Sequence, residues 1–292
     1  MNRVRILPVC AELLIGTIAL DSPVTAQAQG NGRPKTNRTV TTTTTVTGST
    51  SLSGTPTSYP QFGAWIDDAS APTRGVGAVS IGVGHWRLAG MTQTNVPMIG
   101  AGIGVTDRLQ ASASVPFYRV SAPTWSASGV DDMYLSAKYT LLDPTLTISE
   151  VGLAISPVVE ILGADAGDGR VHFAIPVNVE LRRLPFRVYG SAGYFTRGAM
   201  FGGAAVEWSA SNGFSLTGSL MQSYSVKAPD PALGTIGRQH ADVSVGAAMP
   251  IGQTASVYGS VGRSLTSIDA GGTSLAVTGG VALRFSALSS TP

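Results

Sequence analysis

The segment RVHFAIPVNVELRR, residues 170–183, alternates apolar and polar side chains without interruption. Every second position from Val171 to Leu181 is apolar, and the positions between them, from His172 to Arg182, are mostly polar. A period of two places the two sets on opposite faces of one β-strand. The segment therefore predicts a strand with one apolar face and one polar face.

The same alternation recurs from residue 75 almost to the C-terminus. It predicts twelve strands, at residues 75–88, 92–106, 108–120, 129–142, 149–162, 170–183, 185–196, 199–210, 213–226, 237–249, 253–266 and 272–286. Each segment reaches the roughly 9–11 residues that a tilted membrane strand needs. An even number of strands is expected of a barrel whose two termini lie on the same side of a membrane.

The connections between these segments differ in length. VTDR, RRLPFR, SASNGF and PIGQT are tight, whereas SAPTWSASG, GADAGDG and KAPDPALGTIG are longer. In outer-membrane barrels the periplasmic turns are short and the external loops are long. Counted along the chain, the four tight connections are the second, sixth, eighth and tenth. We therefore expect the even-numbered connections and both termini in the periplasm, although the fourth, DPTLTIS, and the seventh, TRG, fit this alternation less well.

The composition indicates what the two faces meet. The chain is 43% hydrophobic and only 12% charged, against roughly 25% charged in ordinary soluble domains. The polar faces consist mostly of Ser, Gly, Thr and Ala, too few charges to coat a soluble β-protein. After the first twenty residues, no stretch stays apolar for the roughly 18 residues of a membrane helix. The sequence therefore predicts an all-β protein, a twelve-stranded antiparallel up-and-down transmembrane β-barrel in a bacterial outer membrane.

Nine aromatic residues on the apolar faces fall at two heights. The group at the ends that we expect to be periplasmic is Tyr139, Phe186, Trp208, Phe214 and Phe285. The group at the opposite ends is Phe117, Phe173, Tyr194 and Tyr224. Two aromatic girdles separated by aliphatic residues are typical of a wall that faces lipid. We therefore expect the apolar face to contact outer-membrane lipid.

The N-terminus predicts export. Residues 1–28 combine a basic start, an apolar stretch and the small-residue site Ala26-x-Ala28, which is the pattern of a cleaved signal peptide. Cys10 is the only cysteine, so the predicted mature chain contains none and needs no thiol chemistry.

A Thr/Ser-rich segment follows, at residues 29–72, before the predicted barrel at 73–288. Its low complexity and few apolar residues favour a flexible periplasmic segment. A plug or a tether to peptidoglycan is an alternative interpretation of the same segment.

The polar faces supply the candidate lumen-lining residues. These are Asp132, Tyr134, Lys138, Glu160, His172, Asn178, Glu180, Arg182, Arg187, Glu207, His240, Asp242 and Arg284. Both signs of charge occur, so the carboxylates could pair with the cations across neighbouring strands, or the set could form a constriction that sorts solutes. Barrels of eight strands are filled and those of 16–18 strands hold a water channel, so twelve strands predict a narrow passage.

Other functions are less well supported. The only histidines are His85, His172 and His240, and no signature surrounds any serine, so an outer-membrane esterase or phospholipase is disfavoured. Asp131 and Asp132 are adjacent in a strand and would point to opposite faces unless a bulge intervenes.

Cofactor and nucleic-acid sites are also disfavoured. GAGIGVTD lacks the G-x-G-x-x-G spacing of a dinucleotide loop, and neither His172 nor His240 has a metal-type ligand nearby in sequence. A net charge of +2 without a basic run argues against nucleic acid. We therefore expect no catalytic residue, metal or cofactor, and a passive channel for small solutes. A non-conducting structural or interaction barrel is the alternative.

Two consecutive motifs carry a resemblance to a known family. GVTDRLQASASVPF, residues 104–117, and GVDDMYLSAKYTLL, residues 129–142, resemble the paired strand motifs of the phenol meta-pathway transporter-like family of outer-membrane barrels. The matching residues are Gly104, Thr106, Asp107, Arg108, Pro116, Phe117, Gly129, Asp132, Lys138 and Tyr139. The resemblance implies a barrel associated with the uptake of small, often apolar molecules.

Overall fold

The computed structural model describes residues 66–88, 90–144, 150–163, 171–196, 198–226, 239–267 and 272–286. The predicted signal peptide and the leader up to residue 65 lie outside these residues. Among the described residues, no helix has the length and hydropathy of a membrane span.

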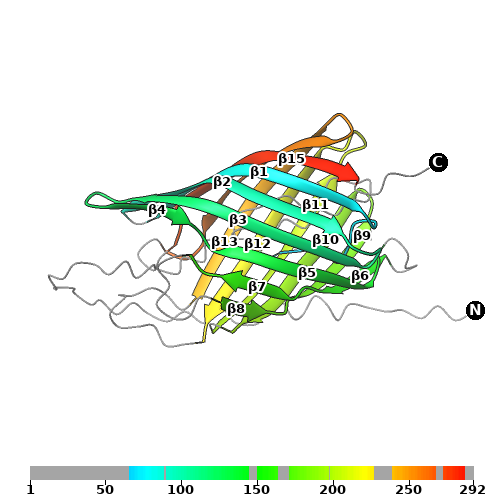
Figure 1. Ribbon diagram of the computed structural model, residues 1–292, viewed down its shortest axis with the longest axis horizontal. Coiled ribbons are helices and arrows are strands. Elements are labelled where there is room, and N and C mark those ends of the chain that lie inside the picture. The colour runs from blue at the N-terminus through cyan, green and yellow to red at the C-terminus, as the bar shows by residue number, and fades with distance from the viewer. Residues whose placement is uncertain are drawn as a thin grey trace, which may run out of the picture. The chain divides into compact units, whose positions relative to one another are not determined.

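The described chain consists of β-strands joined by turns (Figure 1). In chain order the strands are β1 (Val76–Leu88), β2 (Met91–Gly104), β3 (Leu109–Ser121), β4 (Ser126–Val130), β5 (Met133–Leu142), β6 (Val151–Ile155), β7 (Val158–Ile161), β8 (Val171–Ala174), β9 (Val177–Arg183), β10 (Phe186–Phe195), β11 (Ala199–Ser209), β12 (Ser215–Ser225), β13 (Gln239–Ile251), β14 (Ala255–Ser264) and β15 (Leu275–Ser286).

Three of the predicted strands are each interrupted once, so the elements assigned in the described residues form twelve barrel strands. Pro157 separates β6 from β7 and Pro176 separates β8 from β9, because proline has no N–H to donate to the ladder. Asp131 and Asp132 separate β4 from β5. There the pairs Ser114–Tyr134 and Phe117–Val130 leave three residues opposite two, which is a β-bulge.

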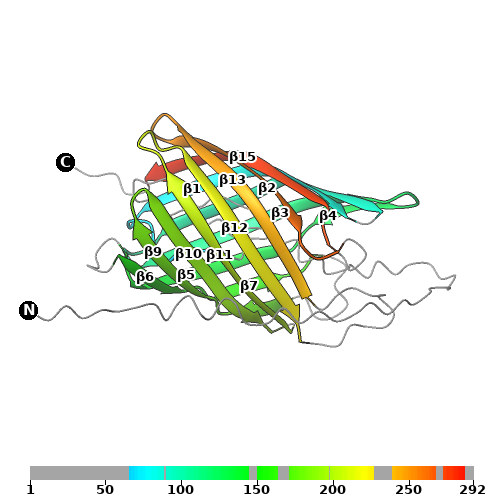
Figure 2. The same ribbon diagram turned by 180° about the vertical axis from the view of Figure 1, so that it is seen from behind.

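The sheet closes on itself. Successive strands pair antiparallel around the wall, and β1 pairs with β15 from Val76–Ser286 to Arg87–Leu275 (Figures 1 and 2). Closure leaves no free edge, since each barrel strand is bonded on both sides. The predicted fold class, a twelve-stranded antiparallel up-and-down barrel, is therefore confirmed.

The strand bounds follow the predicted segments, with one instructive difference. The connection SAPTWSASG was expected to be a long loop, but Ala122 N donates to Trp125 O at 2.9 Å and closes a tight turn. The residues after it, from Ser126, continue the ladder with β3. The β3–β4 hairpin therefore extends beyond its neighbours (Figure 1).

Two ends of the barrel can be distinguished by their connections. We call the end with connections 105–108, 184–185, 210–214 and 252–254 the turn end, and the opposite end the loop end. Positive φ angles at Gly213 and Gly252 suit two of these turns, because glycine has no Cβ to clash in that region.

The apolar faces point outward. In β9, Val177, Val179 and Leu181 are exposed while Asn178 and Glu180 between them are buried. The same alternation runs around the wall, so the outer surface is largely aliphatic and aromatic. Large exposed apolar surfaces of this kind mark contact with a membrane or a partner.

The aromatic residues lie in two rows on this surface. Phe186 pairs with Trp208 near the turn end, and Tyr194 and Tyr224 both pair with Met200 near the loop end. Of the nine predicted girdle residues, eight are exposed and one, Phe214, is half-buried, its ring packed edge-on against Trp208. The exposed eight are Phe117, Tyr139, Phe173, Phe186, Tyr194, Trp208, Tyr224 and Phe285.

Candidate functional site

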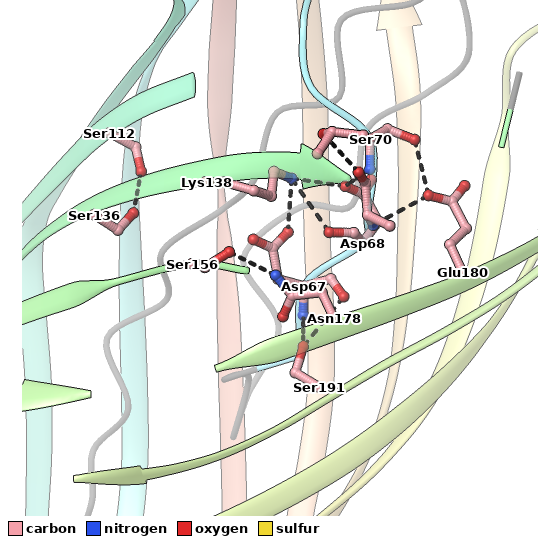
Figure 3. Close-up of polar contacts among 12 residues, drawn as sticks. Asp67, Asp68, Ser70, Ser112, Ser136, Lys138, Ser156, Asn178, Glu180 and Ser191 are labelled. Carbon is pink, nitrogen blue, oxygen red and sulfur yellow. Dashed lines mark hydrogen bonds and ion pairs between the residues drawn. The ribbon is translucent and has the colours of Figure 1, made fainter. Parts of the chain in front are cut away.

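Five residues ahead of the first strand lie inside the barrel. This stretch, Ile66–Ser70, precedes β1 and is held against inward-facing side chains of β5, β9 and β10 (Figure 3). Four of its five residues are buried, and Asp68 has no exposed surface. We call Ile66–Ser70 the strap, because it lies against one side of the lumen and leads back to the turn end.

Asp68 makes the central contacts of the strap. Its Oδ1 lies 2.8 Å from Lys138 Nζ and its Oδ2 lies 2.6 Å from Arg187 Nη2. Both cationic side chains are almost fully buried, at 2% and 1% exposure. Charge-assisted hydrogen bonds this short are stronger than neutral ones, so Asp68 ties the strap to two strands at once.

Glu180 on β9 holds the next residues of the strap. Its Oε2 accepts hydrogen bonds from the backbone N–H of Ala69 at 3.2 Å and the hydroxyl of Ser70 at 2.8 Å. Its Oε1 accepts from Arg182 at 3.0 Å and from Arg187 at 3.1 Å. Each carboxylate oxygen of this buried side chain thus accepts hydrogen bonds from two residues, one oxygen from the strap and the other from two arginines.

Arg187 on β10 connects the strap to β11. Its guanidinium contacts Glu207 at 3.4 Å in addition to Asp68 and Glu180, and it lies 5.2 Å from the ring centre of Tyr189. The planar guanidinium has several N–H donors in a fixed fork, so it contacts three carboxylates at once. Arg187 is therefore the hub of the buried network.

The other end of the strap is held by neutral contacts. The hydroxyl of Ser191 accepts the N–H of Asp67 at 2.7 Å and donates to its carbonyl at 3.2 Å. Ile66 belongs to a buried apolar cluster inside the barrel that includes Tyr189, Phe201 and Met221. The strap thus bridges a charged zone near the turn end and an apolar zone deeper in the lumen.

The chain leaves the strap through a tight passage at the turn end. A Cβ on Gly104 would overlap the carbonyl oxygens of Pro72 and Thr73, so only glycine permits this approach. Asp107 Oδ1 accepts the N–H of Arg74 at 3.3 Å. Gly104 and Asp107 both belong to the sequence motif at residues 104–117, and Lys138 belongs to the second motif.

The ionisation of Asp68 is fixed by its partners. Burial alone would raise the pKa of its carboxyl, but the charges of Lys138 and Arg187 outweigh burial and lower this pKa from 3.8 to about 2. Asp68 is therefore ionised at neutral pH and its ion pairs are complete.

Five of the thirteen lumen-lining candidates belong to this network: Lys138, Glu180, Arg182, Arg187 and Glu207. Glu180 and Glu207 bind arginines, as considered from the sequence. Lys138 instead contacts Asp67 at 3.2 Å and Asp68. Its partner comes from the strap and not from a neighbouring strand.

Four further candidates lie nearer the loop end or mid-barrel. Tyr134 donates to Glu160 Oε1 at 2.8 Å, and Asn178 donates to Ser156 at 2.6 Å. His172 lies opposite Glu160 in the ladder and is half-buried. These contacts join neighbouring strands and involve no strap residue.

Asp132 and Arg284 are candidates at the β4–β5 bulge and on β15. Asp132, at the bulge, accepts the N–H of Gly163 at 3.2 Å. Arg284 shares the inward parity of Ala276 and Ala282 on β15, and it is half-buried.

His240, Asp242 and Ser264 meet near the loop end, but not in a catalytic arrangement. His240 Nε2 lies 2.9 Å from Asp242 Oδ1 and 3.2 Å from Ser264 Oγ, while Ser264 donates to the same Asp242 oxygen at 2.6 Å. A serine–histidine–aspartate triad needs the carboxylate and the serine on opposite ring nitrogens. Here one nitrogen faces both, so the trio joins β13 to β14.

The inner wall formed by β12–β15 and β1 is lined differently. Its hydroxyls pair across neighbouring strands, as Ser219 with Ser244 and Ser260 with Thr278, both at 2.6 Å. Tyr258 lies over glycines of this wall, since a Cβ on Gly82 would come within 2.7 Å of its hydroxyl. Apart from the His240–Asp242 contact near the loop end, the side-chain hydrogen bonds described here for this wall join neutral groups.

Two functional features were missed by sequence reasoning. The strap was placed within a flexible segment, although Asp67 and Asp68 are the first acidic residues after Asp21 and could have signalled a different role. Asp131 is 2% exposed and accepts hydrogen bonds from Gln93 and Asn95, because the bulge turns it inward.

In the described part of the chain, no group of three or more His, Cys, Asp or Glu side chains lies close enough to hold a metal ion.

Comparisons with known proteins show the fold. No protein-family profile and no curated protein matches the sequence. Among solved structures, an outer-membrane channel from Pseudomonas putida F1 superposes with a TM-score of 0.59 at 15% identity, covering 75% of this chain and 98% of that one. The NanC porin gives 0.52 at 8% identity, covering 71% and 100%. The KdgM porin in complex with disordered oligogalacturonate gives 0.50 at 10% identity, covering 70% and 99%. The chain therefore has the fold of outer-membrane barrel channels.

Proposed function

We propose that this protein is an outer-membrane channel for the passive passage of small solutes. The observation that carries the proposal is the closed barrel with an apolar outer surface and a polar inner surface. Only a closed barrel or a helix satisfies every backbone hydrogen bond within a bilayer, and an inner face of hydroxyls and charges suits water. The fold shared with known channels and porins supports the same conclusion.

The lengths of the connections support an orientation in which the turn end would face the periplasm, as short turns do in outer-membrane barrels, and the signal peptide would be cleaved near residue 28. The resemblance of residues 104–117 and 129–142 to the phenol meta-pathway transporter-like family favours small, partly apolar solutes.

The strap is the observation that favours the alternative, a non-conducting structural or interaction barrel. Ile66–Ser70 fills part of the lumen beside the charged network. If the strap never moves, the passage stays narrow and the outer surface and loops would carry the function.

Single-channel recording tests the proposal. Purified full-chain protein, shown to be folded by its heat-dependent mobility in gels, would be inserted into planar bilayers. Reproducible current steps are expected for a channel. Their absence in both the native protein and the Asp68→Asn variant, with both folded, would contradict it and support the structural alternative.

A cysteine scan provides an independent check of the facing. Because the predicted mature chain has no cysteine, single replacements at Ser112 and Val281 can be compared. A charged, water-soluble thiol reagent should modify the inward Ser112→Cys faster than the outward Val281→Cys in vesicles. Equal rates at the two positions would contradict a lipid-facing outer surface.

A further inference from the structure

The contacts of Asp68 describe a binding site as well as a tether. One carboxylate is held by two buried cationic side chains, Lys138 and Arg187, with one cation on each oxygen. Both cations belong to the barrel wall, whereas the carboxylate belongs to a segment that is not part of any strand. Any other carboxylate that reached this place would find the same two donors.

The wall alone carries an excess of positive charge, which the two carboxylates of the strap, Asp67 and Asp68, meet. Lys138, Arg182 and Arg187 contribute three positive charges, and Glu180 and Glu207 contribute two negative charges, which leaves one positive charge in excess. Glu180 and Glu207 already contact the two arginines. In the described part of the chain, both ion pairs of Lys138 are to the strap residues Asp67 and Asp68. Without the strap, Lys138 would lose both of these counter-charges.

The surroundings specify more than the charge. Arg187 stacks near Tyr189, which is also part of the buried apolar cluster with Phe201 and Met221. Ile66 packs into that cluster while the carboxylate of Asp68 binds the two cations. Ile66 and Asp68 are two positions apart in the chain, so their Cα atoms are at most about 7 Å apart. The strap therefore presents an apolar group and a carboxylate to the two adjoining zones.

We propose that Lys138 and Arg187 form a binding site for solutes that carry a carboxylate on an apolar body, and that Asp68 and Ile66 occupy this site as a tethered competitor. This rests on the proposed channel function, whose solute class it names. An incoming carboxylate would replace Asp68 on the two cations, and the released strap would leave room along the wall. The solute would thereby favour the open state of its own passage.

The motif residues fit this role. Gly104 and Asp107 hold the chain where it leaves the strap, and Lys138 holds the strap itself. Residues of both sequence motifs therefore contact the strap or the chain that directly follows it. Anchoring the exit and the carboxylate separately lets Asp68 leave the cations without unfolding β1.

Binding and conduction are measured separately, so that a result against the binding site can be distinguished from a result against the channel function. Titration calorimetry of detergent-solubilised full-chain protein uses 3-phenylpropionate as probe, with 3-phenylpropionamide as its neutral analogue and propionate as the acid without a ring. Asp68→Asn removes the competing charge, and Glu150→Gln removes an exposed rim carboxylate as the matched control.

We expect Asp68→Asn to bind 3-phenylpropionate at least about tenfold more tightly than the native protein does. The reason is that a tethered competitor reduces the apparent affinity by the fraction of time for which the site is free, and about a tenth of the time gives about tenfold. Glu150→Gln should match the native protein. The neutral amide should bind detectably less than the acid in every folded variant, and propionate should bind more weakly than 3-phenylpropionate.

Loss of the site provides the second arm. The double variant Asp68→Asn/Lys138→Gln removes Lys138 together with the more buried of its two carboxylate partners, and it should lose the gain in affinity seen with Asp68→Asn. Equal binding of acid and amide, or equal affinity in the native protein and Asp68→Asn, would overturn the proposal even if both proteins conduct. Absence of conduction with the expected binding would overturn the channel function alone.

Discussion

The two inner walls of the barrel satisfy their buried polar groups in opposite ways. The wall of β12–β15 and β1 uses mainly neutral pairs such as Ser260 with Thr278, and its one described ion pair, His240 with Asp242, also stays within the wall. The wall of β5 and β9–β11 uses charges, and Asp68 reaches Arg187 from 119 positions away in sequence. The hydroxyl wall is complete by itself, whereas the charged wall depends on the strap.

This difference concerns both stability and function. A neutral hydroxyl pair contributes about 0.5–1.5 kcal/mol, and losing it changes little else. A buried network of ions is balanced only when every member is present, and removing one leaves others uncompensated. The charged wall is therefore the place where a small chemical change can move a segment of chain.

The largest effect is expected from Arg187→Met. It leaves Asp68, Glu180 and Glu207 without a shared cation, which should cost about 3–5 kcal/mol of unfolding free energy. Denaturant unfolding of the barrel in detergent measures this. Arg183→Met is the matched control, because Arg183 is exposed and its ion pair with Glu150 should contribute no more than about 1 kcal/mol. Equal losses in the two variants would remove the distinction between the walls.

The second-largest effect is expected at Gly104, where the chain that follows the strap passes the turn end. Gly104→Ala places a methyl group against the carbonyls of Pro72 and Thr73, so it should destabilise the strap by about 1–3 kcal/mol and raise the mean channel current. Gly218→Ala is the control, since a Cβ there meets no atom within 4 Å. Identical currents for the two variants would show that the strap does not limit passage.

A pH series tests the ion pairs of Asp68 with Lys138 and Arg187 without a mutation. Because the pKa of Asp68 is lowered, its ion pairs stabilise the folded protein fully above pH 3.8. This stabilisation is lost as the pH falls from 3.8 to about 2. The difference corresponds to about 2 kcal/mol. Lys138 and Arg187 stay charged in this range. Native current relative to Asp68→Asn should be constant between pH 7 and 5 and should rise below pH 3.8. A rise centred near pH 6 would assign the effect to another group.

The smallest effect is expected from Ser260→Ala on the hydroxyl wall. The variant loses one hydrogen bond with Thr278, so the unfolding free energy should fall by about 1 kcal/mol, with unchanged channel current. A change in current as large as that of Gly104→Ala would show that the hydroxyl wall also controls passage.

The sequence predicted the barrel because strand periodicity is local. Val177, Asn178 and their neighbours reveal their facing by alternation alone, and the wall repeats this rule around the whole sheet. Local chemistry also explains the interruptions at Pro157 and Pro176, which the pattern does not mark as breaks because alternation continues through them.

The candidate site was only partly predictable, because its key partner is remote. The alternation assigns Lys138 and Arg187 to the polar face, and both are buried in the structure, but their partner Asp68 lies in a segment without periodicity. Asp131 escaped for a related reason, since one extra residue in β4–β5 reverses the parity that the prediction relied upon. Both omissions concern where the chain departs from a regular strand.

The most direct test of the central claim compares single-channel conductance of the native protein and Asp68→Asn in the same bilayers at pH 7. The account predicts current steps in both, with larger or longer openings in the variant because the strap has lost its two ion pairs. Identical steps in the two proteins, with both shown to be folded, would contradict the claim that the strap on the charged wall governs passage through the barrel.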